Sequence, residues 1–208
     1  MYFKADALCL KAVDYKEKDK LLTLISAQNG KFTCLARGVR AQNAKLKLAA
    51  SPLCFGEYII LSKGNILTGC QVYDNFFNIW EDAGRAKAAF AILEVLEKIC
   101  PEQEPAAAEL VRALNALKGI CYAPAYPLAY LAWFLAGILN TLGADCAGYN
   151  IKEQTLDFIS SLDCMPMEAV ESLDEDESKI NGVLGILIRV LNHFSALSFP
   201  VLHSVIKN

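Results

Sequence analysis

The spacing of apolar residues changes once along this chain, near residue 81, and this change limits the folds open to it. Before that point, apolar and polar residues alternate in short runs, which is the period of half-buried strands. After it, apolar residues recur every three or four positions, which is the period of amphipathic helices. The pattern predicts an α+β chain of two domains, with strands in residues 1–80 and an all-α helical domain in residues 81–208.

Five strands are predicted in the front part of the chain. The pair Asn29-Gly30 is a strong hairpin signal, and Lys63-Gly64 marks a second turn. Five short strands within about 75 residues suggest a small closed barrel, and the OB-fold is a five-stranded barrel that binds single-stranded nucleic acid. The predicted strands cover residues 5–15, 20–26, 30–38, 55–62 and 65–76.

One predicted helix is apolar enough to raise the question of a membrane. No charged residue occurs between Gly119 and Ala144. Because Pro124 and Pro127 confine the helix to 127–142, it reaches only about 24 Å at about 1.5 Å per residue. A membrane span must cross about 30 Å. We therefore expect a helix buried on all sides, with a membrane span as the alternative.

The other predicted helices have ordinary amphipathic patterns and end at proline or glycine signals. The last one should be preceded by an N-terminal cap from the acidic run 174–177, for which a solvated loop is the alternative. One side of it should carry Leu184, Leu187, Leu191 and Phe194, and Pro200 should lie beyond its end. These helices cover residues 83–100, 105–120, 153–162 and 179–197.

Positive charge is concentrated in the front part, although acids outnumber bases overall. Residues 1–80 carry 11 Lys and Arg against 6 Asp and Glu, whereas residues 81–208 carry 9 against 17. Between Lys20 and Gly56 there are six bases and no acid. An acid-free surface keeps its potential positive and attracts phosphate backbones. This predicts a nucleic-acid interface, and a chance run of bases on a solvated face is the alternative.

The candidate DNA-binding residues are bases of this acid-free segment. They would hold phosphates without reading sequence, because backbone contacts position a protein but specify no base. Aromatic residues of the strands are candidates for stacking on bases, with an ordinary core position as the alternative for each. The bases are Lys31, Arg37, Arg40, Lys45 and Lys47, and the aromatic residues are Tyr15, Phe32, Phe55, Tyr58 and Tyr73.

The chain has eight cysteines, which are spread almost evenly and form no CxxC pair. Such thiols are typical of a reduced cytoplasmic protein in which most of them are buried. The first residues read as a strand and not as a cleavable leader. There is no P-loop, GxSxG or HExxH motif, so the sequence does not predict an enzyme.

The order of these features resembles the RecO family of recombination mediators. That family begins with a strand, a charged turn, an LLTL strand and a GK turn, followed by a basic segment of the form KGxRxxxSKL. Here the basic segment reads Arg37-Gly38-Val39-Arg40, with Lys45-Leu46 following. The apolar segment FLAGILNTLG also matches a long family helix that ends in a leucine-glycine pair. The resemblance implies an OB-fold barrel followed by a helical domain.

Many members of the family carry a zinc site after that glycine, built from two CxxC pairs that supply four thiolates. The corresponding region 143–166 of this chain keeps Cys146 and Cys164 and lacks both pair partners. The histidines, His193 and His203, do not replace them. We therefore predict no metal and no other cofactor.

The resemblance implies a non-enzymatic role in recombinational DNA repair. Family members bind single- and double-stranded DNA, anneal complementary strands, contact single-strand-binding protein and RecR, and help to load RecA. The acidic helical domain would then bind partners, and Lys87, Arg112 and Arg189 are candidates for meeting the acidic tail of single-strand-binding protein. A plain surface charge is the alternative for each of them. The alternative function is a protein–protein adaptor whose barrel does not bind DNA.

Overall fold

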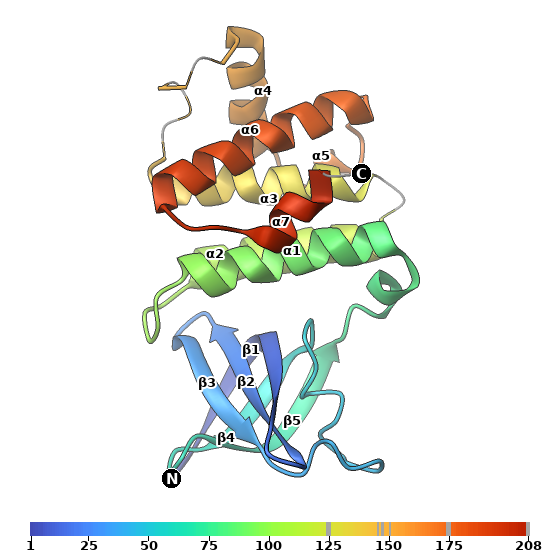
Figure 1. Cartoon of the computed structure of the whole chain (residues 1–208), viewed down its shortest axis with the longest axis vertical. Helices are drawn as coiled ribbons and strands as arrows, with labels where there is room; N and C mark the ends of the chain where they lie inside the picture. The colour runs from blue at the N-terminus through green and yellow to red at the C-terminus, as the bar shows by residue number, and fades with distance from the viewer. Residues whose placement is uncertain (124–125, 145, 147, 150, 174–175, 207–208) are drawn as a thin grey trace. The chain divides into compact units, whose positions relative to one another are not determined.

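The computed structural model of the chain describes residues 1–123, 126–144, 146, 148–149, 151–173 and 176–206 (Figure 1). It divides into two compact units, each of which contains two separate stretches of the chain. The barrel unit comprises Met1–Phe76 and Leu96–Val111, and the helical unit comprises Phe77–Val95 and Arg112–Asn208. The predicted domain boundary after residue 80 stays a prediction.

Five strands form a closed barrel in the order β1-β2-β3-β5-β4, which confirms the predicted five-stranded OB-fold (Figure 1). The long β1 pairs with both β2 and β4, and its register shifts between Cys9 and Lys11, where a bulge bends the strand. The parallel pair of Leu35 and Ile66 joins β3 to β5 and closes the ring. The strands are β1 (Tyr2–Tyr15), β2 (Asp19–Ser26), β3 (Gly30–Ala36), β4 (Phe55–Leu61) and β5 (Ile66–Asp74).

The barrel core follows from the alternation of side chains along each strand. In β4, for example, Gly56, Tyr58 and Ile60 are buried while their neighbours are partly exposed. Cysteines contribute to this core, and five of the eight in the chain are buried. All eight are free thiols, as the sequence predicts.

The turn after α1 (Ala83–Ile99) packs on the β2–β3 hairpin. The Gln103 amide donates to the carbonyl of Lys31 at 3.0 Å, and the Ala106 amide donates to the carbonyl of Ala27 at 3.2 Å. Gly30 has φ +59°, and a Cβ atom there would collide with the backbone of Glu104. Glycine is therefore required at position 30 both by the turn and by this close approach.

The predicted helices are all present, as α1, α2 (Ala107–Tyr122), α3 (Pro127–Thr141), α4 (Glu153–Cys164) and α6 (Glu177–Ser195). Three short elements were not predicted: η1 (Phe77–Glu81), α5 (Met167–Val170) and α7 (Pro200–Ile206). Pro200 lies beyond the end of α6, as predicted. It begins α7, and the first turn of a helix is where proline is tolerated best.

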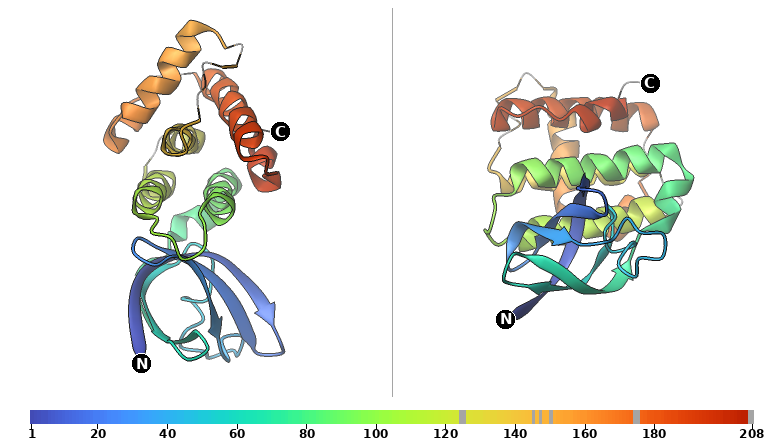
Figure 2. Two further views of the ribbon diagram at one scale, coloured as in Figure 1. Left: turned by 90° about the vertical axis from the view of Figure 1, so that its left-hand side faces the viewer. Right: turned by 60° about the horizontal axis from the view of Figure 1, so that its bottom comes forward.

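Helix α3 is the centre of the helical unit and packs against α4, α5 and α6 (Figure 2). All of its residues from Leu128 to Leu139 are buried, which confirms the predicted buried helix. Among the described residues, no helix has both the length and the hydropathy that crossing a membrane requires.

The buried side of α6 contains Leu184, Leu187 and Leu191, as predicted. Phe194 continues the same helical spacing, and its side chain, in the last turn of the helix, is half exposed. At the other end, the Asp176 side chain accepts a hydrogen bond from the Ser178 amide at 3.2 Å, so the predicted N-terminal cap is confirmed for that residue. The preceding acids of the run, at 174 and 175, lie outside the described residues.

Candidate nucleic-acid interface

The segment 37–54, here called the basic loop, connects β3 to β4 as a series of tight turns. Amides along it donate to carbonyls three residues earlier, as from Ala44 to Ala41 and from Lys47 to Ala44, both at 3.2 Å. Val39 and Ala50 are buried in the barrel core. The apolar residues therefore hold the loop against the barrel while its bases face solvent.

Three further contacts fix the far end of the basic loop. The Leu53 amide donates to the carbonyl of Cys9 at 3.0 Å, and the Cys9 amide donates to the carbonyl of Cys54 at 2.9 Å. The Tyr58 hydroxyl donates to the carbonyl of Ala49 at 3.0 Å from inside the barrel. Tyr58 is fully buried, so it is a core residue and not a platform for bases.

The turn between β1 and β2 lies beside the start of the basic loop. The Arg40 guanidinium is 3.1 Å from the Asp14 carboxylate and donates to the carbonyl of Lys16, also at 3.1 Å. The Asp19 carboxylate accepts from the Gly38 amide at 2.8 Å. Gly38 has φ +66°, a conformation that favours glycine. These contacts bring the turn and the loop onto one surface.

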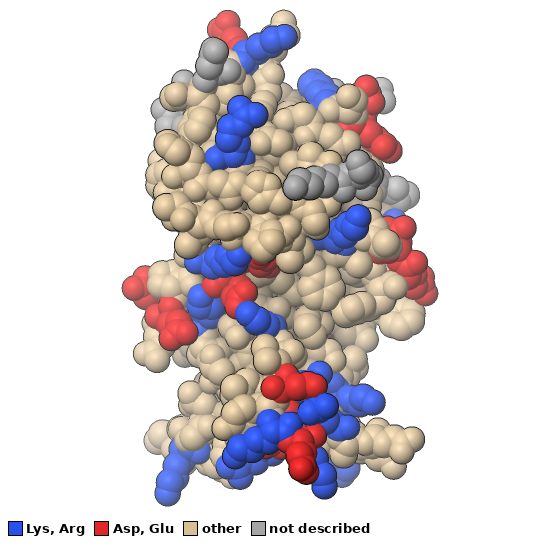
Figure 3. Space-filling view, viewed as in Figure 1, with Lys and Arg blue, Asp and Glu red and all other residues tan. Residues whose placement is uncertain are grey.

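The structure brings four of the five predicted DNA-binding residues together. Arg37, Arg40, Lys45 and Lys47 are all exposed on the basic loop. Lys31 is at the opposite end of β3, where its ammonium group donates to the carbonyl of Glu97. Figure 3 shows Lys and Arg side chains gathered over the barrel with a few carboxylates among them. The basic surface is thus centred on the loop and does not extend along β3.

Sequence reasoning missed Lys16 and Lys18, which lie in the turn next to the basic loop. Both flank Glu17, so a search for acid-free segments passes over them. Tyr15 belongs to the same turn, is exposed, and has the Lys16 ammonium 5.2 Å from its ring centroid. Among the predicted stacking residues, Tyr15 is therefore an exposed aromatic ring beside the basic loop. The sequence alone does not show that these two bases lie beside the basic loop. Their position follows from the pairing of β1 with β2, which places the turn next to the loop.

The remaining aromatic candidates have partners within the barrel. Phe32 packs edge-on against Phe3, with ring centroids 6.1 Å apart. Phe55 packs edge-on against Tyr73 at 5.5 Å, and the Tyr73 hydroxyl donates to the Asp6 carboxylate at 2.9 Å. Their roles as stacking platforms stay predictions.

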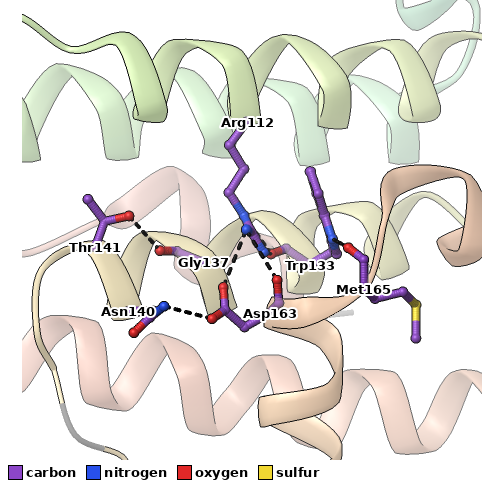
Figure 4. A network of polar contacts seen from close by, with 7 residues as sticks. All are labelled: Arg112, Trp133, Gly137, Asn140, Thr141, Asp163 and Met165. Atoms are coloured by element: carbon purple, nitrogen blue, oxygen red, sulfur yellow. Dashed lines mark hydrogen bonds and ion pairs between the residues drawn. The ribbon is translucent and has the colours of Figure 1, made fainter.

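Arg112, a candidate for partner binding, has its partners inside the helical unit (Figure 4). Its Nε and Nη2 atoms donate to the Trp133 carbonyl at 3.2 and 2.6 Å. Its guanidinium carbon lies 4.2 Å from the centroid of the Trp133 ring. Its Nη1 atom is 3.3 Å from the Asp163 carboxylate. Burial lowers the pKa of Arg112, and Asp163 opposes this effect. Lys87 and Arg189 are exposed on α1 and α6.

The two cysteines of the predicted degenerate zinc region line one hollow of about 470 Å³ in the helical unit. Cys146 and Cys164 share it with Asp163, which is already paired with Arg112 and accepts a hydrogen bond from Asn140. Across the described ranges, no three potential metal ligands come together. The expected absence of a metal stays a prediction.

A second hollow of about 280 Å³ lies at the end of α2. Its wall includes Tyr130, which is fully buried and whose hydroxyl has no hydrogen-bond partner in the described part of the chain. Burial raises the pKa of this phenol, which therefore stays a hydrogen-bond donor. The lining residues are Lys118, Gly119, Tyr122, Ala123, Tyr130, Met167 and Glu171.

The fold and this surface define a class of protein: an OB-fold barrel with an exposed basic loop, followed along the chain by helices. Barrels of this class commonly bind oligonucleotides through such loops. Residues 1–74 match the family model described as Recombination protein O N terminal. This match confirms the predicted relationship to the RecO family for these N-terminal residues.

Curated bacterial relatives named DNA repair protein RecO support the same relationship. The protein of Acetivibrio thermocellus is 27% identical over 144 residues, which are 68% of this chain and 57% of the relative. Those of Syntrophomonas wolfei and Desulforamulus reducens are 32% and 34% identical, over 47% and 50% of this chain and 40% and 41% of the relatives. The chain thus spans about half the length of the curated relatives that it matches.

Proposed function

We propose that this chain acts in DNA repair as a cytoplasmic, non-enzymatic recombination mediator that binds single- and double-stranded DNA through the basic loop. The observation that carries the proposal is the exposure of Arg37, Lys45 and Lys47 on a loop that contains no acid and is anchored in the barrel core. The name of the relatives, DNA repair protein RecO, supports the assignment to repair. The mediator role would include annealing of complementary strands, cooperation with RecR and assistance to RecA.

Binding of this kind should depend on salt and little on sequence, because the bases would contact phosphates. If about five phosphates are neutralised, the slope of log K against log salt should lie near −3.5 to −4.5, at about 0.7–0.9 per contact. The Arg40 guanidinium is already paired with Asp14, so it is the least available of the loop bases.

The test is fluorescence anisotropy of a labelled single strand at several salt concentrations. The variant Arg37→Glu/Lys45→Glu/Lys47→Glu should bind far more weakly and show a slope smaller in magnitude by roughly 2–3. The matched control, Lys87→Glu/Lys152→Glu/Arg189→Glu, makes the same change of charge on the helical unit and should bind like the wild type.

Equal losses in both variants would mean that net charge and not the basic loop governs binding. Absence of salt-sensitive binding in the wild type would contradict the proposal. It would favour the alternative function, a protein–protein adaptor whose barrel binds another protein.

For the acidic, apolar tail of single-strand-binding protein, we propose the 280 Å³ hollow at the end of α2. Tyr122 and Met167 would contact its apolar residues, while Lys118 would meet its carboxylates. Glu171 also lines the hollow, and its negative charge would limit the affinity for the acidic tail. Lys118→Glu should abolish binding of the tail peptide in a titration, and Lys87→Glu should not. The opposite order would exclude this hollow.

A further inference from the structure

The 470 Å³ hollow of the helical unit has an apolar floor, which is lined from α3 and α4. Its wall is held in place by Asp163, which is paired with Arg112 and accepts a hydrogen bond from Asn140 at 2.8 Å (Figure 4). The charge of Asp163 is therefore already balanced within the unit. The apolar residues of the floor are Ala136, Leu139, Leu156 and Ile159.

The exposed charge beside this hollow is negative. Glu153 and Asp157 are both exposed on α4. Glu153 lies three residues before Leu156 and Asp157 lies three before Ser160, so both carboxylates are on the side of the helix that lines the hollow. The surrounding segment 143–177 contains ten acids and one base. The hollow thus suits an apolar side chain that is flanked by positive charge.

The basic loop carries a side chain of this kind. Leu48 is 48% exposed, and it follows the exposed bases Lys45 and Lys47 in a segment without acids. A single exposed leucine is ordinary on a protein surface. This one is notable because the bases beside it match the carboxylates beside the hollow.

We propose that the basic loop of one copy docks in this hollow of a second copy. Leu48 would lie on the apolar floor, with Lys45 and Lys47 beside Glu153 and Asp157. The two surfaces are different parts of the chain, so the contact is heterologous, and a bound pair still has one loop and one hollow available. The assembly can therefore grow beyond two copies.

The first test is sedimentation velocity of the whole chain over a range of protein concentrations. Raising the salt from about 0.1 M to about 1 M shortens the Debye length from about 10 Å to about 3 Å, which screens contacts between exposed charges. At the lower salt, the average mass should rise with concentration past the mass of two chains. At the higher salt, it should stay at the mass of one. A single chain at every concentration in the lower salt would overturn the proposal.

Two variants and their mixture test which surfaces meet. Lys45→Glu/Lys47→Glu changes the loop, Glu153→Gln/Asp157→Asn changes the hollow, and each variant alone should stay a single chain. Mixed together they should form pairs, because the first keeps its hollow and the second keeps its loop. The pairs should not grow, since the remaining loop is acidic and the carboxylates beside the remaining hollow are gone. Assembly of either variant alone, or no pairs in the mixture, would overturn the proposal.

Matched controls separate these sites from general effects of charge and hydrophobicity. Glu81→Gln/Glu168→Gln removes two exposed acids elsewhere on the helical unit and should assemble like the wild type. Leu48→Ser should weaken assembly, whereas Val111→Ser, at a side chain that is 56% exposed, should not. Equal effects within either comparison would contradict docking of the loop in the hollow. Thermal melting identifies any variant that fails to fold.

The thiol of Cys164 reports on the hollow directly, because it is exposed and lines it. Its alkylation should be slower in concentrated than in dilute wild-type protein, and equally fast at both concentrations in Lys45→Glu/Lys47→Glu. Cys70, a partly exposed thiol of the barrel, is the internal control. Trypsin releases the two in peptides 153–179 and 64–85, each with a single cysteine. Assembly without protection of Cys164 would place the contact elsewhere and overturn the proposal.

Self-association does not require that the chain bind DNA, and only the competition between the two rests on the proposed function. If the loop bases hold phosphates, added single-stranded DNA should return the assembly to single chains. Assembly that forms as described while the chain shows no DNA binding would support this inference and contradict the proposed function. Salt-sensitive DNA binding by a chain that never assembles would have the opposite meaning.

Discussion

At the scale of single residues, Arg112 shows why a base in an acidic region need not face a partner. Its guanidinium lies on the Trp133 ring and is paired with Asp163 (Figure 4). Gly137 makes this possible, because a Cβ atom there would overlap the guanidinium. From the sequence alone, Arg112 is one of the few bases in an acidic region, and Gly137 is a glycine within an apolar helix. Their contact depends on how two helices pack, which periodicity does not specify.

Gly137→Ala should destabilise the protein by about 1–3 kcal/mol, because the new methyl group displaces Arg112 from Trp133 and Asp163. Chemical denaturation measures the change in the free energy of unfolding. The control is Gly185→Ala in α6, where nothing lies within 4 Å of the added Cβ. Alanine is the better helix former, so this variant should gain up to about 1 kcal/mol. Equal effects of the two substitutions would contradict the proposed overlap.

Tyr58→Phe should cost about 1 kcal/mol of stability, since it leaves the Ala49 carbonyl without the hydroxyl that donates to it. Because that carbonyl belongs to the basic loop, trypsin should also cleave the loop faster in the variant. Tyr15→Phe changes the same group on the surface and should shift stability by less than about 0.5 kcal/mol. An unchanged rate of loop cleavage in Tyr58→Phe would show that the hydroxyl does not hold the loop.

At the scale of elements, the long strands and helices could be predicted from the period of their apolar residues. Each of them is long enough for this period to repeat several times. The short α5 and α7 could not, since a helix of four to seven residues has too few positions to show one. Phe194 keeps the helical period of α6, but its side chain lies in the last turn and is half exposed, which the period alone does not show.

Removing the N-terminal cap of α6 should destabilise the helical unit. Asp176→Ala removes the acceptor for the Ser178 amide and should cost about 1 kcal/mol. Asp176→Asn keeps an acceptor oxygen and should recover most of this loss. Thermal or chemical unfolding of the two variants separates capping from charge, and a full loss in Asp176→Asn would assign the effect to charge alone.

At the scale of the whole molecule, the basic surface was predictable in sign and in part of its membership. Arg37, Lys45 and Lys47 lie close together in an acid-free part of the sequence, so the charge composition of that segment is enough to identify them. Lys16 joins them only because the first hairpin folds back beside the loop, and Lys31 is separated from them by the length of β3. The barrel thus assembles its basic surface from turns at one end, which a linear count of charges cannot resolve.

A fragment of residues 1–80 should be less stable than the barrel within the whole chain. It lacks the segment Leu96–Val111, and with it the hydrogen bonds of Gln103 and Ala106 to the β2–β3 hairpin. Hydrogen exchange of the β2 and β3 amides should therefore be faster in the fragment. Equal protection in the two proteins would mean that the returning segment adds nothing to the barrel.

The chain passes between the two units three times, because Leu96–Val111 belongs to the barrel unit and the residues on either side of it do not. A domain joined by one linker can be copied into another protein by a single gene fusion. Here, a fusion that ends after the fifth strand leaves behind part of the barrel unit. The barrel and the helices that interrupt it should therefore have been inherited together, and a free-standing copy of this barrel in another protein would need its own replacement for the returning segment.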